Sequence, residues 1–211
     1  MKQRSEEWFK AREGRFTSSE FHKLMGIKGL GQTGDTYCHE KAVESFFGRS
    51  DEEQFISFDM KRGTDLEPVA FDIFAEKKGQ DFIDVSECAF FPYGDNSGSS
   101  PDGLVGKDAI LEIKCPRYGK FFNLVTHGEQ AIDKSYMIQM QHQMMCTNSV
   151  RCHFFNYIVY NGEHMYHEIV VDRDEKVITL IKERLTEAVE KRDEYIKDLE
   201  SFSMDMVNNG L

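Results

Sequence analysis

The stretch that decides the fold reads Ser99-Ser-Pro-Asp-Gly-Leu104 and, after four intervening residues, Ala109-Ile-Leu-Glu-Ile-Lys-Cys-Pro116. The second segment is rich in apolar residues that favour a β-strand, and the Pro-Asp-Gly of the first is typical of a turn. Glu112 and Lys114 are two residues apart, so on a strand their side chains share one face. The stretch therefore predicts a hairpin region that gathers Asp102, Glu112 and Lys114.

These three charged side chains suit metal-dependent cleavage of a phosphodiester. Two opposite charges on one face of an apolar strand cost free energy when they are buried without partners. A divalent cation at the carboxylates, with a phosphate or a water beside the lysine, would offset that cost. Carboxylate oxygens are hard ligands, which favours Mg²⁺ or Mn²⁺ over Zn²⁺. The pattern predicts a nuclease, but the residues alone leave open a turn-capping Asp102 and a surface Glu112–Lys114 pair.

Length and composition indicate one ordinary domain spanning residues 1–211. A chain of this size with 40% hydrophobic residues can bury a substantial core. No apolar run approaches the roughly 20 residues of a membrane span, and the polar start lacks the apolar region of a secretory leader. The five cysteines are odd in number and show no Cys-x-x-Cys spacing, which is typical of reduced thiols. We therefore expect a cytoplasmic protein.

The net charge of −11 opposes a DNA-binding function and needs a physical answer. Neutralisation of phosphates by lysine and arginine supplies most of the affinity for DNA. An acidic chain can still bind DNA if its basic residues gather on one face and metal ions offset the carboxylates. The candidates for such a face are Arg12, Arg15, Lys23, Lys28, Lys61, Arg62, Lys114, Arg117 and Lys120.

Hydrophobic periodicity predicts alternating helices and strands. Helices are expected over residues 6–13, 18–24, 35–47, 64–77, 120–126, 133–147 and 174–199, and strands over 82–92, 98–105, 109–115, 150–160 and 164–171. Asn161-Gly162 predicts a tight hairpin turn between the last two strands. Residues 29–34 are expected to form a flexible loop and residues 201–211 a loose tail. Leu180 and Ile181 are expected on the buried stripe of the last helix. This order of elements predicts an α/β domain.

Glu67 lies at helical spacing from the apolar Ala70 and Phe74, so its carboxylate would share their face. Thr64-Asp-Leu-Glu67 also matches a capping box, and Pro68 suits the first turn of a helix. From the residues alone, the helix-capping interpretation is the simpler one.

Arg12 lies one turn beyond Trp8 and is followed by Thr17 and Ser19 near an expected helix start. An arginine, two hydroxyls and free backbone N–H groups would make a pocket for a terminal phosphate. An exposed arginine beside ordinary helix caps explains the same residues, and the residues alone favour that interpretation. Further along the chain, Gln139 and Gln143 are one helical turn apart, with Tyr136 on the same side.

Several of these segments resemble one known family in their order along the chain. The segments 99–104 and 111–116 resemble the PD-(D/E)xK nucleases and, within them, the lambda exonuclease / YqaJ viral recombinase family. Residues 8–12 and 16–20 are similar to its N-terminal phosphate-binding segment, and residues 63–67 to the helix with its upstream acidic residue. Residues 136–141 resemble its glutamine motif. The similarity spans residues near 5 to near 175.

The resemblance implies a restriction-endonuclease-like core, in which helices flank a central mixed β-sheet. It implies an exonuclease that degrades one strand of linear duplex DNA from the 5′ end, releasing 5′-mononucleotides and leaving 3′ overhangs. Asp102 and Glu112 would hold Mg²⁺ with the backbone carbonyl of Ile113, and Glu67 would support the metal site. Two ions roughly 4 Å apart are expected, with Mn²⁺ as a substitute. Lys114 would orient or deprotonate the attacking water.

The resemblance also assigns roles outside the metal site. Gln139 would lie at the active-site edge, and Met60 would be a wedge that separates the strands. The residues that would bind the 5′-phosphate are Arg12, Thr17, Ser19 and Ser100. Residues 5–30 would form the phosphate-binding segment, residues 60–175 the catalytic core and residues 174–199 a C-terminal helix.

By the same resemblance we expect a ring-shaped homotrimer around double-stranded DNA ends. A single-strand annealing protein would be its partner, and a phage or prophage in a bacterial cell its origin. An endonuclease or repair nuclease with the same core stays open, as does a DNA-binding protein with a decayed nuclease site. A structural or interaction protein is the third alternative.

Overall fold

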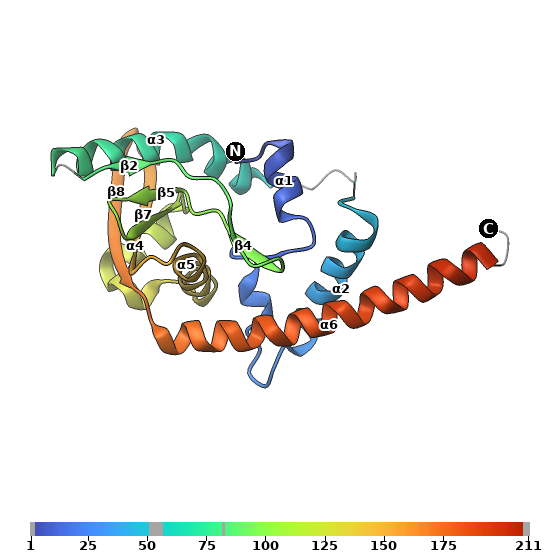
Figure 1. Cartoon of the computed structure of the whole chain (residues 1–211). Helices are drawn as coiled ribbons and strands as arrows, with labels where there is room; N and C mark the ends of the chain where they lie inside the picture. The colour runs from blue at the N-terminus through green and yellow to red at the C-terminus, as the bar shows by residue number, and fades with distance from the viewer. Residues whose placement is uncertain (1–2, 51–56, 82, 209–211) are drawn as a thin grey trace.

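A five-stranded mixed sheet forms the centre of the structure, a computed structural model that describes residues 3–50, 57–81 and 83–208 (Figure 1). Its strands are β2 (Val85–Ser86), β5 (Gly103–Val105), β6 (Ala109–Lys114), β7 (Arg151–Tyr160) and β8 (Glu163–Asp172), in that order across the sheet. Neighbouring strands are antiparallel, except that β6 and β7 are parallel. The predicted α/β class and the central mixed sheet are confirmed.

Helices cover both faces of this sheet. On one face, Phe74 of α3 (Phe58–Gln80) packs with Leu111 and Ile113 of β6. On the other face, α4 (Tyr118–His127) and α5 (Lys134–Thr147) pack against Ile110. Because β6 is covered on both sides, its sequence is an almost continuous apolar run in which charged residues stand out.

The crossover between the parallel strands β6 and β7 supplies the helices of the second face. Parallel neighbours cannot be joined by a tight turn. The chain therefore leaves β6 through α4, the short 3₁₀ helix η2 (Gly128–Ala131) and α5 before it returns as β7. The last pair, β7 and β8, forms the predicted hairpin, with Asn161 and Gly162 both at positive φ in the turn. This route places α5 against the strand that carries Glu112 and Lys114.

A second, three-stranded sheet connects the N-terminal segment to the chain that precedes Asp102. Its strands are β1 (Phe16–Thr17), β4 (Ser97–Ser99) and β3 (Phe91–Tyr93), with β1 parallel to β4. Helix α1 (Glu6–Arg12) comes just before it, and its cap Ser5 accepts from the Trp8 N–H. Gly98 is required here, since an added Cβ would lie 2.2 Å from the Phe90 ring.

A separate apolar cluster holds this N-terminal part in place. It joins the 3₁₀ helix η1 (Phe21–Leu24) and α2 (Gly31–Phe47) to α6 (Glu175–Asn208) and one side of α5. Figure 1 shows α6 running alongside α2 and projecting beyond the body of the molecule. None of the helices among the described residues combines the length and apolar character needed to span a bilayer.

Several predicted element boundaries are wrong, and the expected strand over 98–105 is divided between β4 and β5. Helix α2 begins at Gly31, inside the expected 29–34 loop, and the expected helix over 18–24 shrinks to the 3₁₀ turn η1. The expected tail is helical to Asn208, because residues 201–208 contain no glycine or proline to end the helix. Residues 209–211 lie outside the described part. On α6, Leu180 is exposed, and Ile178 belongs to the buried stripe instead.

The capping-box interpretation of Glu67 is also wrong. Helix α3 begins at Phe58, where the Ser57 hydroxyl accepts from the Met60 N–H at 3.2 Å. Thr64 is therefore in the helix interior and donates to the Met60 carbonyl. Met60, expected ahead of the helix, lies in its first turn. Pro68 is inside the helix, so it does not mark the start that its sequence context indicated.

Candidate active site

Asp102 is fixed against the edge of β6 by its own backbone and side chain. Its N–H donates to the Leu111 carbonyl at 2.9 Å, and its Oδ2 accepts from the Ile113 N–H at 2.6 Å. The preceding Pro101 carbonyl accepts from the Gln3 amide at 2.8 Å and from the Cys88 thiol. The predicted turn thus places the Asp102 carboxylate next to the strand residue that follows Glu112.

Glu112 is 2% exposed, and donors occupy both of its carboxylate oxygens. Oε1 accepts from Lys114 Nζ at 2.5 Å and from Gln139 Nε2 at 2.6 Å, while Oε2 accepts from Gln143 Nε2 at 2.6 Å. The two glutamines are one turn apart on α5, which explains why both reach the same carboxylate. Hydrogen bonds of this kind are what allow a charged group to be buried.

Negative charge dominates this cluster. The pKa of Asp102 is raised well above its usual value, first by burial and then by the Glu112 and Glu67 carboxylates. Burial opposes the Lys114 ammonium, but the Glu112 and Asp102 carboxylates outweigh it and raise the pKa of Lys114. Lys114 therefore carries its proton, and three carboxylates share its neighbourhood. The arrangement favours binding of a further cation.

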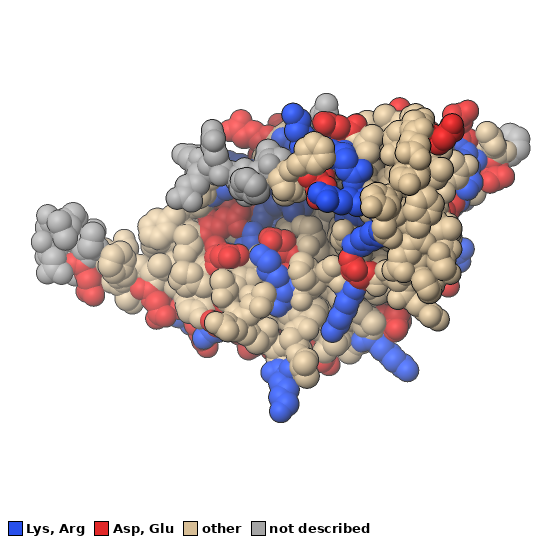
Figure 2. Space-filling view, turned by 180° about the vertical axis from the view of Figure 1, so that it is seen from behind, with Lys and Arg blue, Asp and Glu red and all other residues tan. Residues whose placement is uncertain are grey.

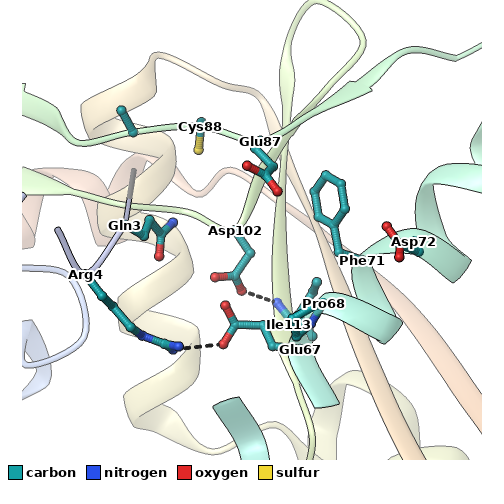
Figure 3. Close-up of a pocket in the computed structure, with 11 residues that line it drawn as sticks. Gln3, Arg4, Glu67, Pro68, Phe71, Asp72, Glu87, Cys88, Asp102 and Ile113 are labelled. Carbon is teal, nitrogen blue, oxygen red and sulfur yellow. Dashed lines mark hydrogen bonds and ion pairs between the residues drawn. The ribbon is translucent and has the colours of Figure 1, made fainter. Parts of the chain in front are cut away.

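Glu67 approaches the cluster from α3 and is paired with the N-terminal segment. In Figure 3 its carboxylate points toward Asp102, and Arg4 reaches it from the other side of the cavity. The Arg4 guanidinium lies 3.1 Å from Glu67 Oε2, and both side chains are partly exposed. Arg4 has a φ of 65°, an uncommon backbone conformation for a residue other than glycine. Nothing in the sequence pattern identified Arg4.

Two cavities meet at Arg4, Glu67 and Ile113. The first has a volume of about 690 Å³ and is lined by Gln3, Arg4, Glu67, Pro68, Phe71, Asp72, Glu87, Cys88, Ala89, Asp102 and Ile113. The second has a volume of about 640 Å³ and is lined by Arg4, Ser19, Asp59, Met60, Arg62, Gly63, Thr64, Glu67, Ile113, Lys114, Cys115, Pro116, Arg117, Lys120 and Tyr136. The carboxylate cluster therefore has open space on both sides.

The second cavity is the basic one. Of the nine basic residues expected on a DNA-binding face, Arg62, Lys114, Arg117 and Lys120 line it, and Arg4 joins them. Lys114 and Lys120 also lie over the Tyr136 ring, at 4.8 and 4.2 Å from its centroid. Figure 2 shows lysine and arginine side chains gathered around a hollow, with acidic side chains close by. Four of the nine expected basic residues thus gather at one cavity, where Lys114 and Arg117 are paired with Glu112 and Asp59.

Three of the four residues expected to bind a 5′-phosphate belong to a connected chain of contacts. Arg12 donates to Thr17 Oγ1 at 3.2 Å and stacks over the Trp8 ring at 4.0 Å. Trp8 Nε1 donates to Ser100 Oγ at 2.8 Å. Ser19 is exposed at the second cavity. The expected helix start beside Thr17 is wrong, because Thr17 belongs to β1 and η1 begins only at Phe21.

The three glutamines of α5 divide into two groups. Gln139 and Gln143 hold Glu112, whereas Gln141 faces the start of α6. Its amide donates to the Asp172 carbonyl, and its Oε1 accepts from the Asp174 N–H, both at 2.9 Å. The i, i+4 spacing pointed to Gln143, but its contact with Glu112 could not be predicted from sequence.

The donor set fits a hard divalent cation, although no protein cluster is complete by itself. In the described ranges, no three Asp, Glu, His or Cys side chains form a group that could hold a metal ion. Asp102 and Glu112, with a backbone carbonyl and water, would supply the oxygen ligands that Mg²⁺ prefers. The chemistry of this donor set supports the fit, and burial together with the Glu112 and Glu67 carboxylates raises the pKa of Asp102, which a bound cation would oppose.

Comparisons with known proteins agree with this geometry. The sequence model of the YqaJ-like viral recombinase domain matches residues 7–149. An alkaline exonuclease of Laribacter hongkongensis, LHK-Exo, is 29% identical, with a TM-score of 0.82 over 96% of this chain and 100% of that chain. A phage-related exonuclease of Haemophilus somnus 129PT is 18% identical and shares the fold, with a TM-score of 0.72 over 90% and 99% of the two chains. The uncharacterized protein ExoD of Escherichia coli strain K12 is 32% identical over 72 residues, which are 34% of this chain and 83% of that protein.

Proposed function

The chain belongs to the YqaJ-like viral recombinase family, and on this premise we propose that it is a metal-dependent 5′→3′ exonuclease of double-stranded DNA. It removes 5′-mononucleotides from one strand and leaves a 3′ single-stranded overhang. The observation that carries the proposal is the contact of buried Glu112 with Lys114, which lines the basic cavity, beside Asp102, which lines the adjoining acidic one. The relative LHK-Exo is an exonuclease similar to this chain over nearly its whole length, and it was also solved in complex with dAMP.

Asp102 and Glu112 would hold Mg²⁺, with Mn²⁺ as a substitute, and the backbone carbonyl of Ile113 would be a further ligand. Glu67 lies across the cavity and would support the site. Bound divalent ions supply positive charge to the reacting phosphate and lower the pKa of a bound water. A pair of ions stabilises both the attacking and the leaving oxygen. Gln139 and Gln143 keep the Glu112 carboxylate in one orientation through their amide donors.

Lys114 acts as a positively charged donor at the reacting phosphate. Its Nζ is held at Glu112 Oε1 and over the Tyr136 ring, and its raised pKa keeps the proton on nitrogen. In this state Lys114 orients the attacking water and stabilises the negative charge that develops on the phosphate. A positioned charge of this kind contributes only in the transition state, so its loss would lower turnover more than DNA binding.

The polarity of degradation follows from the contacts of Arg12. We propose that Arg12, Thr17, Ser19 and Ser100 receive the 5′-phosphate of the strand being degraded. Arg12 is held by Thr17 and by the Trp8 ring, and Trp8 in turn holds Ser100, so an incoming phosphate meets pre-positioned donors. An arginine fork matches the geometry of phosphate oxygens.

Met60 is the proposed wedge between the strands. Its side chain is 57% exposed and lines the basic cavity. Apolar side chains that enter between base steps unstack a duplex, which is the role proposed here.

A ring-shaped trimer and a single-strand annealing partner belong to the same proposal. Sedimentation at three times the chain mass tests the trimer.

One gel tests the proposed function. The purified protein and Mg²⁺ are incubated with end-labelled linear duplex, either 5′-phosphorylated or 5′-hydroxyl, beside a covalently closed circle. We expect mononucleotides from phosphorylated 5′ ends, slower loss of hydroxyl ends and an intact circle. Lys107→Ala, in the exposed turn between β5 and β6, is the control that keeps wild-type activity. Cleavage of the circle would favour the endonuclease alternative, and no cleavage of any substrate would favour the decayed nuclease site.

A further inference from the structure

A buried histidine connects three parts of the chain that carry proposed site residues. His142 lies on α5 and is completely buried. Its Nδ1 is 2.6 Å from Ser18 Oγ, and its Nε2 is 2.9 Å from Ser97 Oγ. The Phe21 ring stacks on the imidazole, with centroids 4.3 Å apart and planes at 25°. The imidazole is therefore held by partners from both the N-terminal segment and β4.

The hydrogen-bond network determines which nitrogen of His142 carries the proton. Ser97 Oγ donates its only hydrogen to the Phe16 carbonyl at 2.7 Å, so toward His142 it can only accept. Nε2 must then be the protonated nitrogen, and Nδ1 accepts from the Ser18 hydroxyl. Burial lowers the pKa of His142 to about 3, which keeps the ring neutral and this single arrangement in place.

The partners of His142 are next to the two halves of the proposed site. Ser18 lies between Thr17 and Ser19, and Ser97 begins the strand that leads to Ser100. On its own helix, His142 is between Gln139 and Gln143, which hold Glu112. The 5′-phosphate pocket and the catalytic carboxylate thus share one rigid connection.

We propose that His142, through Ser18 and Ser97, is a positioning residue that sets the 5′-phosphate pocket at a fixed distance from Glu112. The inference rests on the proposed function. A terminal phosphate in the pocket then places the scissile bond at the metal site. Duplex ends without that phosphate are not aligned at the metal site in this way. Because alignment of the reacting atoms governs rate steeply, loosening the connection lowers turnover of phosphorylated ends.

The test compares 5′-phosphorylated with 5′-hydroxyl duplex in the Ser18→Ala variant. This change removes the donor to Nδ1 and leaves the imidazole and its packing in place. We expect the ratio of kcat/KM for the two ends to fall about tenfold, the scale of one buried hydrogen-bonding group left unpaired. The loss should appear in kcat for phosphorylated ends more than in KM. His142→Phe, which keeps the ring stack, should lower the ratio at least as far.

A matched control separates positioning from general destabilisation. Ser149 is also a buried serine, follows α5 beyond His142, and has its hydroxyl 2.9 Å from Thr147 Oγ1. Ser149→Ala should keep the wild-type ratio even if it lowers the melting temperature. Adding Ser18→Ala to Arg12→Ala should lower the ratio no further than Arg12→Ala alone, since the pocket has then already lost its main ligand.

Two failures can be told apart. If the wild-type protein does not cleave DNA, or cleaves both kinds of end equally well, the proposed function fails. If the wild-type protein prefers phosphorylated ends and Ser18→Ala keeps that preference, or slows both substrates by the same factor, the positioning role of His142 is overturned. An additive effect of Ser18→Ala and Arg12→Ala would overturn it as well.

Discussion

Glu112 on β6 and Glu168 on β8 are similar in burial and differ in their electrostatic surroundings. They belong to the same sheet, separated by β7, and their side chains are 3% and 13% exposed. Each accepts from a lysine, at 2.5 Å from Lys114 for Glu112 and at 2.7 Å from Lys78 for Glu168. Geometry and burial alone would assign the two carboxylates the same role.

Their neighbours differ in charge. Glu168 also accepts from His153 at 2.7 Å and lies 3.6 Å from Lys77. The hydrogen bond from His153 contributes most to lowering the pKa of Glu168 to about 2, and Lys78 adds to this effect against the opposing effect of burial. Glu112 has Asp102 as its acidic neighbour, whose pKa is raised by burial and by Glu112 and Glu67. Glu168 is electrostatically compensated by the protein, whereas the Glu112 cluster has excess negative charge beside two cavities. Compensation indicates a structural role for Glu168, and the excess negative charge beside Glu112 suits the metal-binding role proposed for it and Asp102.

Replacing the lysine of each cluster by alanine should give opposite results. Lys114→Ala should lower cleavage at least about a thousandfold, because it removes a charge used in the transition state, while DNA binding persists. Lys78→Ala should leave cleavage within about twofold and lower thermal stability instead. Single-turnover cleavage and a filter-binding assay with each variant measure both effects. Full activity of the Lys114→Ala protein would contradict the proposed mechanism.

Replacing the carboxylate of each cluster should also separate an effect on cleavage from an effect on stability. Glu112→Gln should abolish Mg²⁺-dependent cleavage, with at least about a thousandfold loss in kcat. Its melting temperature should change little, because Gln143 Oε1 has no hydrogen-bond partner and the Gln143 amide can turn to accept from the new amide. Calorimetry beside the nuclease assay gives both numbers, and a variant that loses stability and activity together would contradict this prediction.

Glu168→Gln should show the reverse pattern. Loss of the charge beside Lys78 and His153 should lower stability by about 2 kcal/mol, which corresponds to about 4–8 °C in melting temperature for a chain of this size. Cleavage at a temperature well below the transition should be unchanged. Differential scanning calorimetry measures the shift. An unchanged melting temperature would mean that Glu168 is not the compensated structural carboxylate described above.

Glu168 should also make the stability of the folded protein depend on pH in the acid range. The folded protein holds the pKa of Glu168 at about 2 against an ordinary value of 4.5, so the unfolded chain binds the proton more readily. The ionised Glu168 contributes at most about 3 kcal/mol to the free energy of unfolding. This contribution is complete above pH 4.5 and is lost as the pH falls from about 4.5 toward about 2. Glu168→Gln should remove that part of the pH dependence. Urea unfolding at pH 6, 4 and 3 measures it, and parallel curves for the two proteins would contradict it.

The features that could be predicted from sequence are those formed by residues that lie close together in the chain. Asp102, Glu112 and Lys114 belong to one hairpin region, so a short motif could predict their meeting. Apolar strands and the Asn161-Gly162 turn predicted the β7–β8 hairpin, whereas the central mixed sheet was expected from the family resemblance. The i, i+4 spacing of Gln139 and Gln143 also indicated a common face before their shared partner was known.

The features that sequence missed depend on contacts far apart in the chain. Ser18 and His142 are 124 residues apart, and Arg4 and Glu67 are 63 residues apart, so no local pattern joins them. Glu67 was first interpreted as a helix cap because Thr64 and Pro68 imitate a helix start. The true start at Phe58 depends on Ser57 and on the packing of α3 against the sheet. Local signals of this kind are overridden by tertiary contacts.

A titration with Mn²⁺ followed by electron paramagnetic resonance tests the proposed metal site. We expect the wild-type protein to bind Mn²⁺ in competition with Mg²⁺, and Asp102→Asn to weaken this binding at least about tenfold. Asp108→Asn, an exposed aspartate in the turn before β6, is the matched control and should bind like the wild-type protein. Equal Mn²⁺ affinity in the wild-type and Asp102→Asn proteins would contradict the assignment of this cluster as the catalytic metal site.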